Sequence, residues 1–472
     1  MRLGGGHWLS LFGLTGLAAV LRFARLGTWS LWIDEANTLW LTQYLSGKRP
    51  TDAYPLFFWL ERQMVDAFGT SEFALRLLPA LLGIASVPLL YLLFRRAAGE
   101  RAAFWAALLM ALSPWHVFWS QNARYYTLLL VIALFLYRLA WDWWERGGRL
   151  RLYGVIGLGG PGLLTQYSLA LAWPALAVYP LFARWASGGR DPRFAWRRVA
   201  LFAGALALPV LAALGRLVSF GERFADLPRH YGDSPFVLLA GLGYHLGLPL
   251  AVAMLLGVWS LRGQRDRERR RFTLFLTVGG LGPVLVAAAS TAKIIATNYY
   301  VFFALPFFVL LAGLALTESR ERRHLNLLAA LLLAAVSLQR LALYYTVQHG
   351  DRIRWRQAVA YIQRERLPGD RIISSGSEAV SYYLGEEPAR LNETDRQTMI
   401  QWELKPEWRQ PTGRTWYLVN DELIAQLDRD GAFRRFLSEE CDARKELPAW
   451  NGPKNRTARV YLWAPQAPGG NP

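Results

Sequence analysis

The sequence is short of the residues that build covalent or metal-bound frameworks. It contains a single cysteine, Cys441, so an intrachain disulfide is excluded. Its six histidines are scattered, and none forms an H-x-x-x-H or similar ligand spacing. The sequence therefore predicts neither a disulfide scaffold nor a metal site.

Acidic residues are scarce beside basic ones, 35 Asp and Glu against 53 Lys and Arg, which gives a formal net charge of +18. A chain this basic raises the question of nucleic acid. We exclude nucleic acid as a partner because the arginines form short clusters between apolar runs and no single stripe. Hydrophobic residues make up 53% of the chain. They gather in blocks of about 17–25 residues, the length with which a helix crosses the hydrocarbon core. This pattern predicts a polytopic α-helical protein embedded in membrane lipids.

About eleven apolar spans can be drawn on this basis. They cover residues 7–24, 72–94, 102–119, 123–141, 152–168, 169–183, 199–218, 235–260, 272–290, 298–317 and 325–346. The first span has a basic start but no small-x-small cleavage site after it, so we interpret it as a retained helix. The Gly-Gly-Pro-Gly segment 159–162 is expected to break the apolar run, so that the fifth and sixth spans form broken or tilted helices.

The distribution of arginine tests this drawing independently, because cytoplasmic loops are enriched in Lys and Arg. Alternate loops are basic: those near 95–101, 146–151, 184–198, 262–271 and 320–323. The opposite loops are poor in basic residues, and the loop 113–122 has none. We therefore expect a cytoplasmic N-terminus and an external C-terminus in the inner or plasma membrane.

The character of the chain changes after the last span. We divide it into a transmembrane domain, residues 1–348, and a small external α/β domain, residues 349–472, with a disordered tail. A helix is predicted over 355–366, with strands at 371–375, 415–419 and 459–463. The first external loop, residues 25–71, is long and rich in aromatic residues. Within it, 36–46 and 55–68 are predicted to be short helices along the membrane surface.

The pair Asp34-Glu35 in this loop is the first candidate for chemistry. Two adjacent carboxylates among apolar and aromatic neighbours are expected to be partly desolvated and to repel each other. Both effects raise a carboxylate pKa and favour a general base. The alternative is that the pair caps the helix that follows. From the pair alone the two interpretations are evenly matched.

A second cluster lies in the external segment 113–126. Arg124 is its only basic residue, among amides and tyrosines that include Asn122 and Tyr125. A guanidinium in this setting suits a phosphate held in a fork, and the alternative is an interfacial anchor. His116, in the same segment, is more typical of a hydrogen-bonded interfacial histidine than of a catalyst.

A third cluster, residues 293–300, begins with another isolated cation, Lys293, and continues with Asn298 and Tyr299. Three external segments thus offer a carboxylate pair, an arginine and a lysine. Carboxylates with isolated cations suit transfer of a group from a membrane-borne phosphate donor. The cations would stabilise the departing phosphate, and a carboxylate would take the proton of the acceptor.

At these residues the chain resembles the GT-C glycosyltransferases that use polyprenyl-phosphate sugars, in particular the family 39 type. Members of this type are related to the protein O-mannosyltransferases and to the lipid A aminoarabinose transferase. The resemblance covers nearly the whole chain and rests on the following segments: LRFARLGTWSLWIDEA, GTSEFALRLLPALLG, SPWHVFWSQNARYYTL, NYYVFFALPFFVLL and WRQAVAYIQRERLPGDRII. Relatives often carry Arg-Tyr where this chain has Asn298-Tyr299, so Lys293 is a candidate to supply that charge.

The resemblance implies an inverting hexosyl or pentosyl transfer at the outer membrane face, with a glycan, lipid or protein as acceptor. Asp34 would be the base, with Glu35 assisting, and Arg124, Tyr125 and Lys293 would lie near the donor phosphate. His116, Asn122, Asn298 and Tyr299 are candidates to line the site. Some GT-C enzymes bind a divalent cation beside the acidic pair, so the resemblance leaves metal open. The alternatives are a transporter or lipid-linked sugar flippase, for which polar groups would lie at mid-membrane depth, and a non-catalytic scaffold.

Overall fold

The computed structural model describes residues 5–44, 55–189, 191–225, 234–294, 296–317, 323–394, 401–409, 411, 413–451 and 454–465. The last seven residues of the predicted tail lie outside this set. The chain forms two compact units. The first comprises residues 1–24, 47–67 and 76–341, and the second comprises 25–46, 68–75 and 342–472. The two ends of the long first loop, residues 25–46 and 68–71, therefore belong to the same unit as the C-terminal region.

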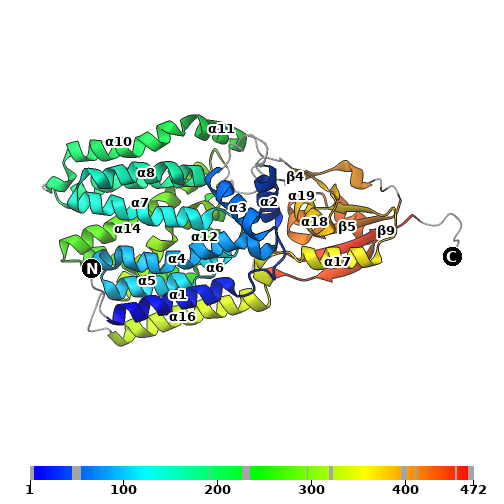
Figure 1. Cartoon of the computed structure of the whole chain (residues 1–472), viewed down its shortest axis with the longest axis horizontal. Coiled ribbons are helices and arrows are strands. Elements are labelled where there is room, and N and C mark those ends of the chain that lie inside the picture. The colour runs from blue at the N-terminus through cyan, green and yellow to red at the C-terminus, as the bar shows by residue number, and fades with distance from the viewer. Residues whose placement is uncertain are drawn as a thin grey trace. The chain divides into compact units, whose positions relative to one another are not determined.

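The first unit is built from helices (Figure 1). Its earlier helices are α1 (Gly5–Phe23), α3 (Pro55–Phe68), α4 (Glu72–Ala98), α5 (Glu100–Leu112), α6 (Pro114–Ser120), α7 (Tyr126–Arg146), α8 (Arg149–Thr165), η1 (Tyr167–Leu171) and α9 (Ala172–Ala186). Its later helices are η2 (Pro192–Phe194), α10 (Trp196–Ala212), α11 (Leu214–Ala225), α12 (Pro235–Leu246), α13 (Leu248–Trp259), η4 (Ser260–Arg262), α14 (Arg267–Ser290), η5 (Asn298–Ala304), α15 (Leu305–Ala315) and α16 (Arg323–Thr346).

Six helices of the described residues are long and apolar enough to cross a membrane, and up to eight spans result if each of two bent pairs counts as one. The bent pairs are α5 with α6, at 61°, and α12 with the helical segment that follows it, at 100°. A shorter apolar helix, Trp8–Phe23, matches the first predicted span in position. The polytopic helical architecture is thus confirmed, and the number of eleven spans stays a prediction.

The segment 159–162 does not break the chain as predicted. Helix α8 continues through it to Thr165, and the break comes at Gln166, where the backbone is extended. The glycines serve close packing instead, because a Cβ at Gly159 would lie 2.6 Å from the Pro209 side chain and one at Gly162 would lie 2.2 Å from Leu169. Small residues at helix contacts allow this approach between membrane helices.

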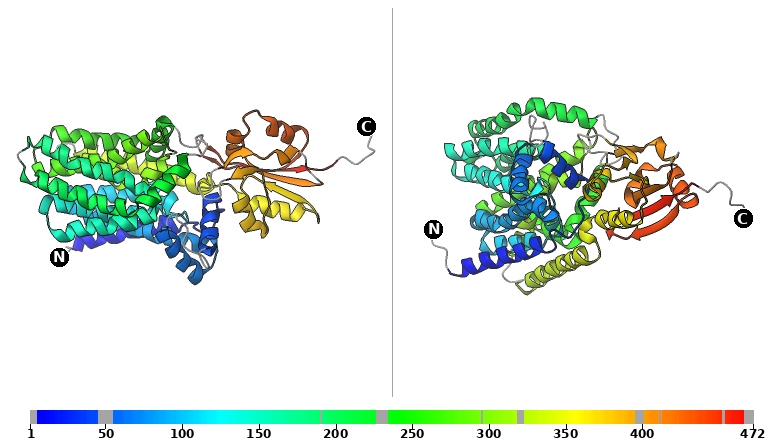
Figure 2. Two further views of the ribbon diagram at one scale, coloured as in Figure 1. Left: turned by 90° about the horizontal axis from the view of Figure 1, so that it is seen from above. Right: turned by 45° about the vertical axis from the view of Figure 1, so that its right-hand side comes forward.

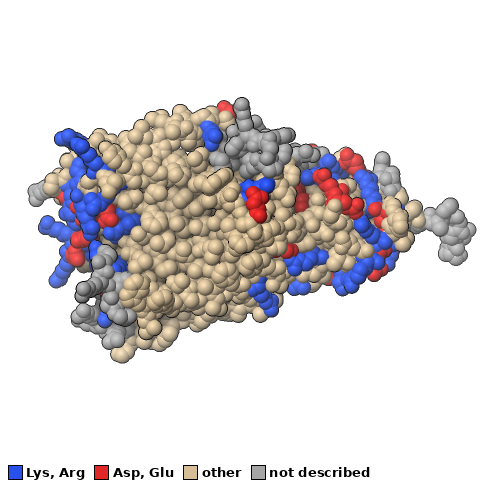
Figure 3. Space-filling view, viewed as in Figure 1, with Lys and Arg blue, Asp and Glu red and all other residues tan. Residues whose placement is uncertain are grey.

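Ion pairs join the basic loops at one end of the helical unit. Glu145, at the end of α7, accepts hydrogen bonds from both Nε and Nη2 of Arg271 at 2.9 Å. The same carboxylate accepts one from Arg193 Nη1 at 2.6 Å. Figure 3 shows Lys and Arg gathered at this end of the unit and a flank with almost no charge. Three of the loops that the sequence placed on one side of the membrane therefore lie together.

The second unit contains a mixed sheet with helices on both faces (Figure 2). Its helices are α2 (Ile33–Tyr44), η6 (His349–Asp351), α17 (Trp355–Glu365), α18 (Ser377–Leu384), η7 (Pro406–Arg409), α19 (Asp421–Leu427) and α20 (Ala432–Glu439). Its strands are β1 (Arg371–Ser374), β2 (Ala389–Arg390), β3 (Asn392–Thr394), β4 (Gln401–Leu404), β5 (Thr415–Asn420), β6 (Asp442–Leu447), β7 (Trp450–Asn451), β8 (Lys454–Asn455) and β9 (Ala458–Trp463).

The main sheet has the order β2-β1-β5-β9-β6, in which β1 pairs with β2 and β5 in parallel and β9 pairs antiparallel to β5 and β6. Successive side chains of a strand point to opposite faces. Trp416 and Leu418 accordingly pack in one core with α17 and α18, and Tyr417 and Val419 pack in the other with α19 and α20. The predicted helix and all three predicted strands of this domain are confirmed.

Candidate functional site

The acidic pair lies in the first turn of α2. The backbone N–H of Glu35 donates to the carbonyl of Trp32 at 3.0 Å, and the N–H of Trp32 donates to Glu35 Oε2 at 3.4 Å. A carboxylate three residues into a helix that accepts from the capping residue is one half of a capping box. The helix-cap interpretation therefore describes Glu35.

Glu35 also forms a buried ion pair. Its side chain is 0% exposed, and Oε2 lies 3.2 Å from Nε of Arg352, which is 1% exposed. Nη1 of this arginine donates to the carbonyl of Gly350 at 2.6 Å. Desolvating two charges costs several kcal/mol for each ion, and removal of one partner from such a pair is strongly destabilising. Glu35 is therefore committed to Arg352.

The turn before Arg352 has an unusual backbone. His349, Gly350 and Asp351 have φ of 50°, 65° and 56°. For the two non-glycine residues this left-handed conformation costs of order 1–3 kcal/mol each, and such strain persists only where the surroundings impose it. Here the Trp29 ring supplies that constraint: it lies 5.1 Å from the His349 ring, and a Cβ at Gly350 would come within 2.8 Å of it.

A second set of contacts holds the chain just before the acidic pair. Arg356 pairs with Glu72 and donates to the carbonyl of Gly27 at 3.2 Å. The hydroxyl of Tyr383 donates to Glu72 Oε1 at 3.0 Å and accepts from the N–H of Leu31 at 2.6 Å. Burial disfavours the charge of Arg356, but its hydrogen bond and attraction to Glu72 outweigh burial and raise its pKa. The segment leading to Asp34 is thus held by a permanent cation and a tyrosine.

Asp34 differs from its neighbour. Its side chain is half-buried, whereas that of Glu35 is fully buried. Its backbone carbonyl accepts from Thr38 Oγ1 at 3.0 Å, one turn further along α2. No group of three His, Cys, Asp or Glu side chains suited to a metal occurs among the described residues. Because Glu35 already serves Arg352, the donor set around Asp34 does not fit a divalent cation held by the protein alone.

In the helical unit, Arg124 and Tyr125 form one structure. Nη2 of Arg124 donates to the Tyr125 hydroxyl at 3.1 Å, and the guanidinium carbon lies 4.7 Å from the centre of the Tyr125 ring. The Phe57 ring of α3 meets Tyr125 edge-on at 6.0 Å. Arg124 is half-buried and Tyr125 is 3% exposed. The ring thus sets the orientation of a guanidinium that retains partial access to solvent.

Aromatic packing joins the second and third sequence clusters. The Trp119 ring lies 5.1 Å from the ring of Tyr299 and 3.9 Å from that of Tyr126. The Asn298 side chain packs against α12, where a Cβ on Gly241 would be 3.2 Å from it. Lys293 is exposed just after α14, and Asn122 is fully buried.

His116 is fully buried, and its ring hydrogen-bonds to side chains of two other helices. Arg22 Nη2 lies 2.8 Å from Nδ1 of His116, and Ser86 Oγ lies 3.0 Å from Nε2. Since a guanidinium can only donate, Nδ1 is the acceptor and Nε2 carries the proton. The hydroxyl of Ser86 in turn donates to the carbonyl of Gly83 at 2.8 Å. These bonds match the interpretation of His116 as a hydrogen-bonded structural histidine.

Sequence reasoning missed Arg22, Glu72, Arg352 and Arg356. Each looked like an ordinary charge near the end of a span or in a polar domain, although Arg22, Glu72 and Arg356 all lie in segments on which the resemblance rests. The acidic pair belongs to one unit. Arg124 and Lys293 belong to the other. A shared site of the three stays a prediction.

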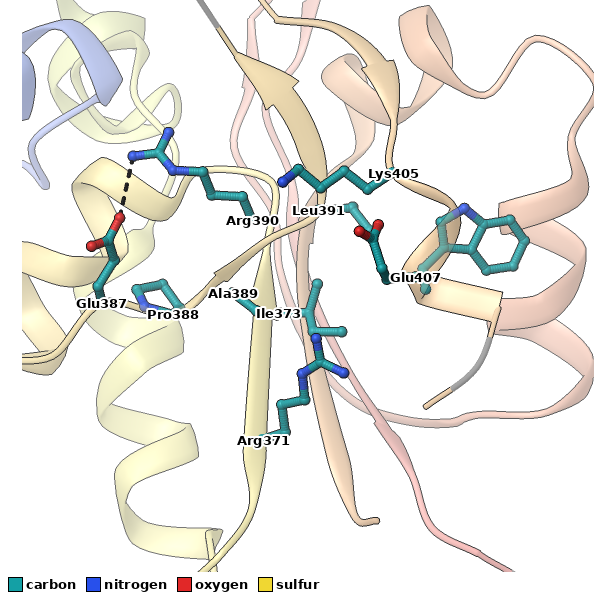
Figure 4. A pocket seen from close by; sticks show the side chains of 10 residues that line it. Arg371, Ile373, Glu387, Pro388, Ala389, Arg390, Leu391, Lys405 and Glu407 are labelled. Carbon is teal, nitrogen blue, oxygen red and sulfur yellow. Dashed lines mark hydrogen bonds and ion pairs between the residues drawn. The ribbon is translucent and has the colours of Figure 1, made fainter. Parts of the chain in front are cut away.

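The second unit also has a pocket of about 500 Å³. It is lined by β1, β2 and the β4–η7 segment, with the following charged side chains: Arg371, Glu387, Arg390, Lys405 and Glu407 (Figure 4). Arg390 is paired with Glu378 and lies 3.5 Å from Glu387. Positive and negative groups are nearly balanced there, so the lining does not select for an anion.

Comparison with known proteins supports the fold. Residues 48–213 match the family model of dolichyl-phosphate-mannose-protein mannosyltransferases. The structure of ArnT from Cupriavidus metallidurans in the apo state aligns with 98% of this chain and 98% of its own, with a TM-score of 0.60 and 15% identity. The same protein bound to undecaprenyl phosphate aligns with 99% and 100%, with a TM-score of 0.57 and 14% identity. No curated protein matches the chain.

The helical unit, the small α/β unit and these matches define a polytopic membrane protein with a GT-C fold like that of ArnT. Residues 48–213 are similar to the dolichyl-phosphate-mannose-protein mannosyltransferases, and the chain as a whole shares its fold with ArnT. The resemblance stated from sequence is thereby confirmed.

Proposed function

We propose that this protein transfers a sugar from a polyprenyl-phosphate donor to an acceptor hydroxyl at the outer face of the membrane, with Asp34 as the base. The observation that carries the proposal is the contrast within the acidic pair. Glu35 is buried against Arg352, whereas Asp34 is half-buried at the start of the same helix. Of the two carboxylates, Asp34 is the one suited to meet an acceptor.

The donor class is supported by two comparisons. The matched family is named for dolichyl-phosphate-mannose, and the ArnT structure of similar fold contains undecaprenyl phosphate. Arg124, oriented on the Tyr125 ring, offers a planar guanidinium that can hold two phosphate oxygens at once. The proposed role of Lys293, which is exposed, is to add a second positive charge.

The proposed reaction is one displacement. The acceptor oxygen attacks the anomeric carbon and forms the new glycosidic bond, while the bond from that carbon to the phosphate oxygen breaks. The electron pair leaves with the polyprenyl phosphate, whose charge Arg124 and Lys293 stabilise. The proton of the acceptor hydroxyl passes to Asp34. Attack on the face opposite the leaving group inverts the anomeric configuration.

The external location is proposed from charge. Basic side chains of three loops gather at one end of the helical unit, around Glu145, as expected of a cytoplasmic side. On this basis the N-terminus is cytoplasmic, and the Asp34 loop and C-terminal domain are external. The glycosyltransferase family match favours this function over a transporter or flippase. The acceptor is a glycan, a lipid or a protein that presents a hydroxyl.

The test is Asp34→Asn in membranes supplied with labelled polyprenyl-phosphate sugars. We expect the rate of transfer to fall at least about a hundredfold, the usual contribution of a general base, with donor binding retained. Asp66→Asn is the matched control, because Asp66 lies in α3 of the same loop and forms an exposed ion pair with Arg62. Parental transfer by Asp34→Asn would refute the assignment of the base.

A further inference from the structure

Three contacts reach the segment around Asp34 from the C-terminal part of the chain. Arg352 holds Glu35, directly after Asp34. The Tyr383 hydroxyl holds the N–H of Leu31, three residues before it, at 2.6 Å. The backbone N–H of Arg356 donates to Ser30 Oγ at 3.2 Å. The start of α2 is therefore fixed on both sides of the proposed base.

We infer that Arg352 is a positioning residue for the reaction, which sets the direction of the Asp34 carboxylate through its buried ion pair with Glu35. This inference rests on the proposed function of Asp34. It assigns the external domain a part in catalysis: the domain supplies the arginine that orients the base.

The geometry of a helix explains how the pair would act. Successive side chains leave an α-helix about 100° apart. A rotation of α2 that moved Glu35 away from Arg352 would turn Asp34 by the same angle. The bond from Arg352 Nε to Oε2 of Glu35 resists that rotation, and the bond from the Leu31 N–H to the Tyr383 hydroxyl holds the chain just before the helix. Fixing the buried Glu35 therefore fixes the direction of the half-buried Asp34.

The ion pair is not explained well by stability alone. Replacing a buried pair by apolar residues of similar volume is often neutral or stabilising. The strained turn at His349–Asp351, which aims Arg352 towards Glu35, is a further cost. A charged hydrogen bond fixes the direction of the Glu35 side chain, and apolar packing does not.

The same principle separates positioning from folding in an experiment. The double variant Glu35→Leu/Arg352→Met replaces the pair by apolar groups and leaves no charge buried alone. We expect it to unfold in detergent at the parental temperature and to keep the parental donor KM. We expect kcat to fall by roughly a hundredfold, since a displacement of about 1 Å in a reacting group has that effect. Arg444→Met is the matched control, because Arg444 forms an exposed ion pair with Asp442 in the same domain.

Arg352→Lys gives a second measurement. A lysine keeps the charge but cannot contact Glu35 and the Gly350 carbonyl with one rigid fork, so we expect kcat between those of the parent and the double variant. A folded double variant with parental kcat would overturn the inference. If the double variant unfolds, Arg352→Lys decides: parental kcat overturns the inference, and a lowered kcat at parental donor KM supports it.

Asp34→Asn in the same preparation distinguishes this inference from the proposed function. Inactive Asp34→Asn with a fully active, folded double variant would leave Asp34 as the base and remove only the role of Arg352. Active Asp34→Asn would remove both.

Discussion

In the helical unit, the fully buried guanidinium of Arg22 donates to the carbonyl of Ala111 at 2.8 Å and to that of Met110 at 3.2 Å, and it contacts Nδ1 of His116. In the second unit, the fully buried guanidinium of Arg352 meets the carboxylate of Glu35. The first arginine holds neutral groups at the last turn of α5, where helix carbonyls carry partial negative charge. The second holds a full charge beside a half-buried carboxylate.

The two buried arginines have different partners, neutral carbonyls for Arg22 and a carboxylate for Arg352, and we infer different roles for them. Arg22 supplies a hydrogen bond to the Ala111 carbonyl at the bend before α6, in addition to its contacts with Met110 and His116, so it ties three helices together. Arg352 forms an ion pair with Glu35 that two apolar side chains could have replaced. The contribution of Arg352 is therefore to orient the start of α2, where Asp34 lies. The comparison predicts that losing Arg22 affects stability and that losing Arg352, with Glu35 replaced, affects catalysis.

The largest expected effect is therefore on stability, in Arg22→Met. The variant takes this donor from the Ala111 carbonyl, at about 1–3 kcal/mol for a buried group left unpaired. It also removes contacts to the Met110 carbonyl and His116 Nδ1, which keep the Ser113 N–H and Ser120 Oγ as partners. We expect the midpoint of thermal unfolding in detergent to fall clearly, with the kcat of the remaining folded enzyme unchanged. Arg62→Met, at an exposed ion pair, serves as the control. A lowered kcat at parental stability would erase the distinction between the two arginines.

A smaller effect is expected for Gly350→Ala, which acts on the turn that aims Arg352. At φ +65° an alanine is strained, and its Cβ would meet the Trp29 ring at 2.8 Å. We expect a loss of about 2 kcal/mol in the free energy of unfolding and a lowered kcat.

Gly385→Ala provides the control for this change. Gly385 also has a positive φ, +78°, in the same unit, but nothing lies within 4 Å of an added Cβ. The stability loss in Gly385→Ala therefore reports backbone strain alone. The additional loss of unfolding free energy in Gly350→Ala measures the clash with Trp29. Equal effects of the two variants on stability and kcat would show that this contact does not support Arg352.

Much of this fold could be predicted from the sequence, because hydrophobic length and arginine placement are local signals. The strands at 371–375 and 459–463 followed from short strand-like runs in a polar region, and β1 and β9 lie there. The predicted break at 159–162 failed because glycine is ambiguous. The same residue that weakens an isolated helix lets Pro209 and Leu169 pack closely against α8.

The candidate site was less accessible to sequence reasoning, since its contacts join residues far apart in the chain. Asp34-Glu35 stood out as a pair, but nothing local distinguishes the buried member from the half-buried one. That assignment depends on Arg352, 317 positions after Glu35. His116 stood out as a chemical group, and Arg22, 94 positions away, supplies the contact that makes it structural.

The smallest expected effect concerns Arg124, which stacks on the Tyr125 ring and donates to its hydroxyl. Lysine at this position keeps the charge but loses the planar fork and its stacking on Tyr125. We expect Arg124→Lys to raise the donor KM by about tenfold, roughly 1.4 kcal/mol, with kcat and thermal unfolding near parental values. Arg149→Lys is the control, because Arg149 is an exposed arginine at the start of α8. If donor KM stays parental while stability falls, Arg124 belongs with Arg22 as a structural residue, and the donor phosphate must be held elsewhere.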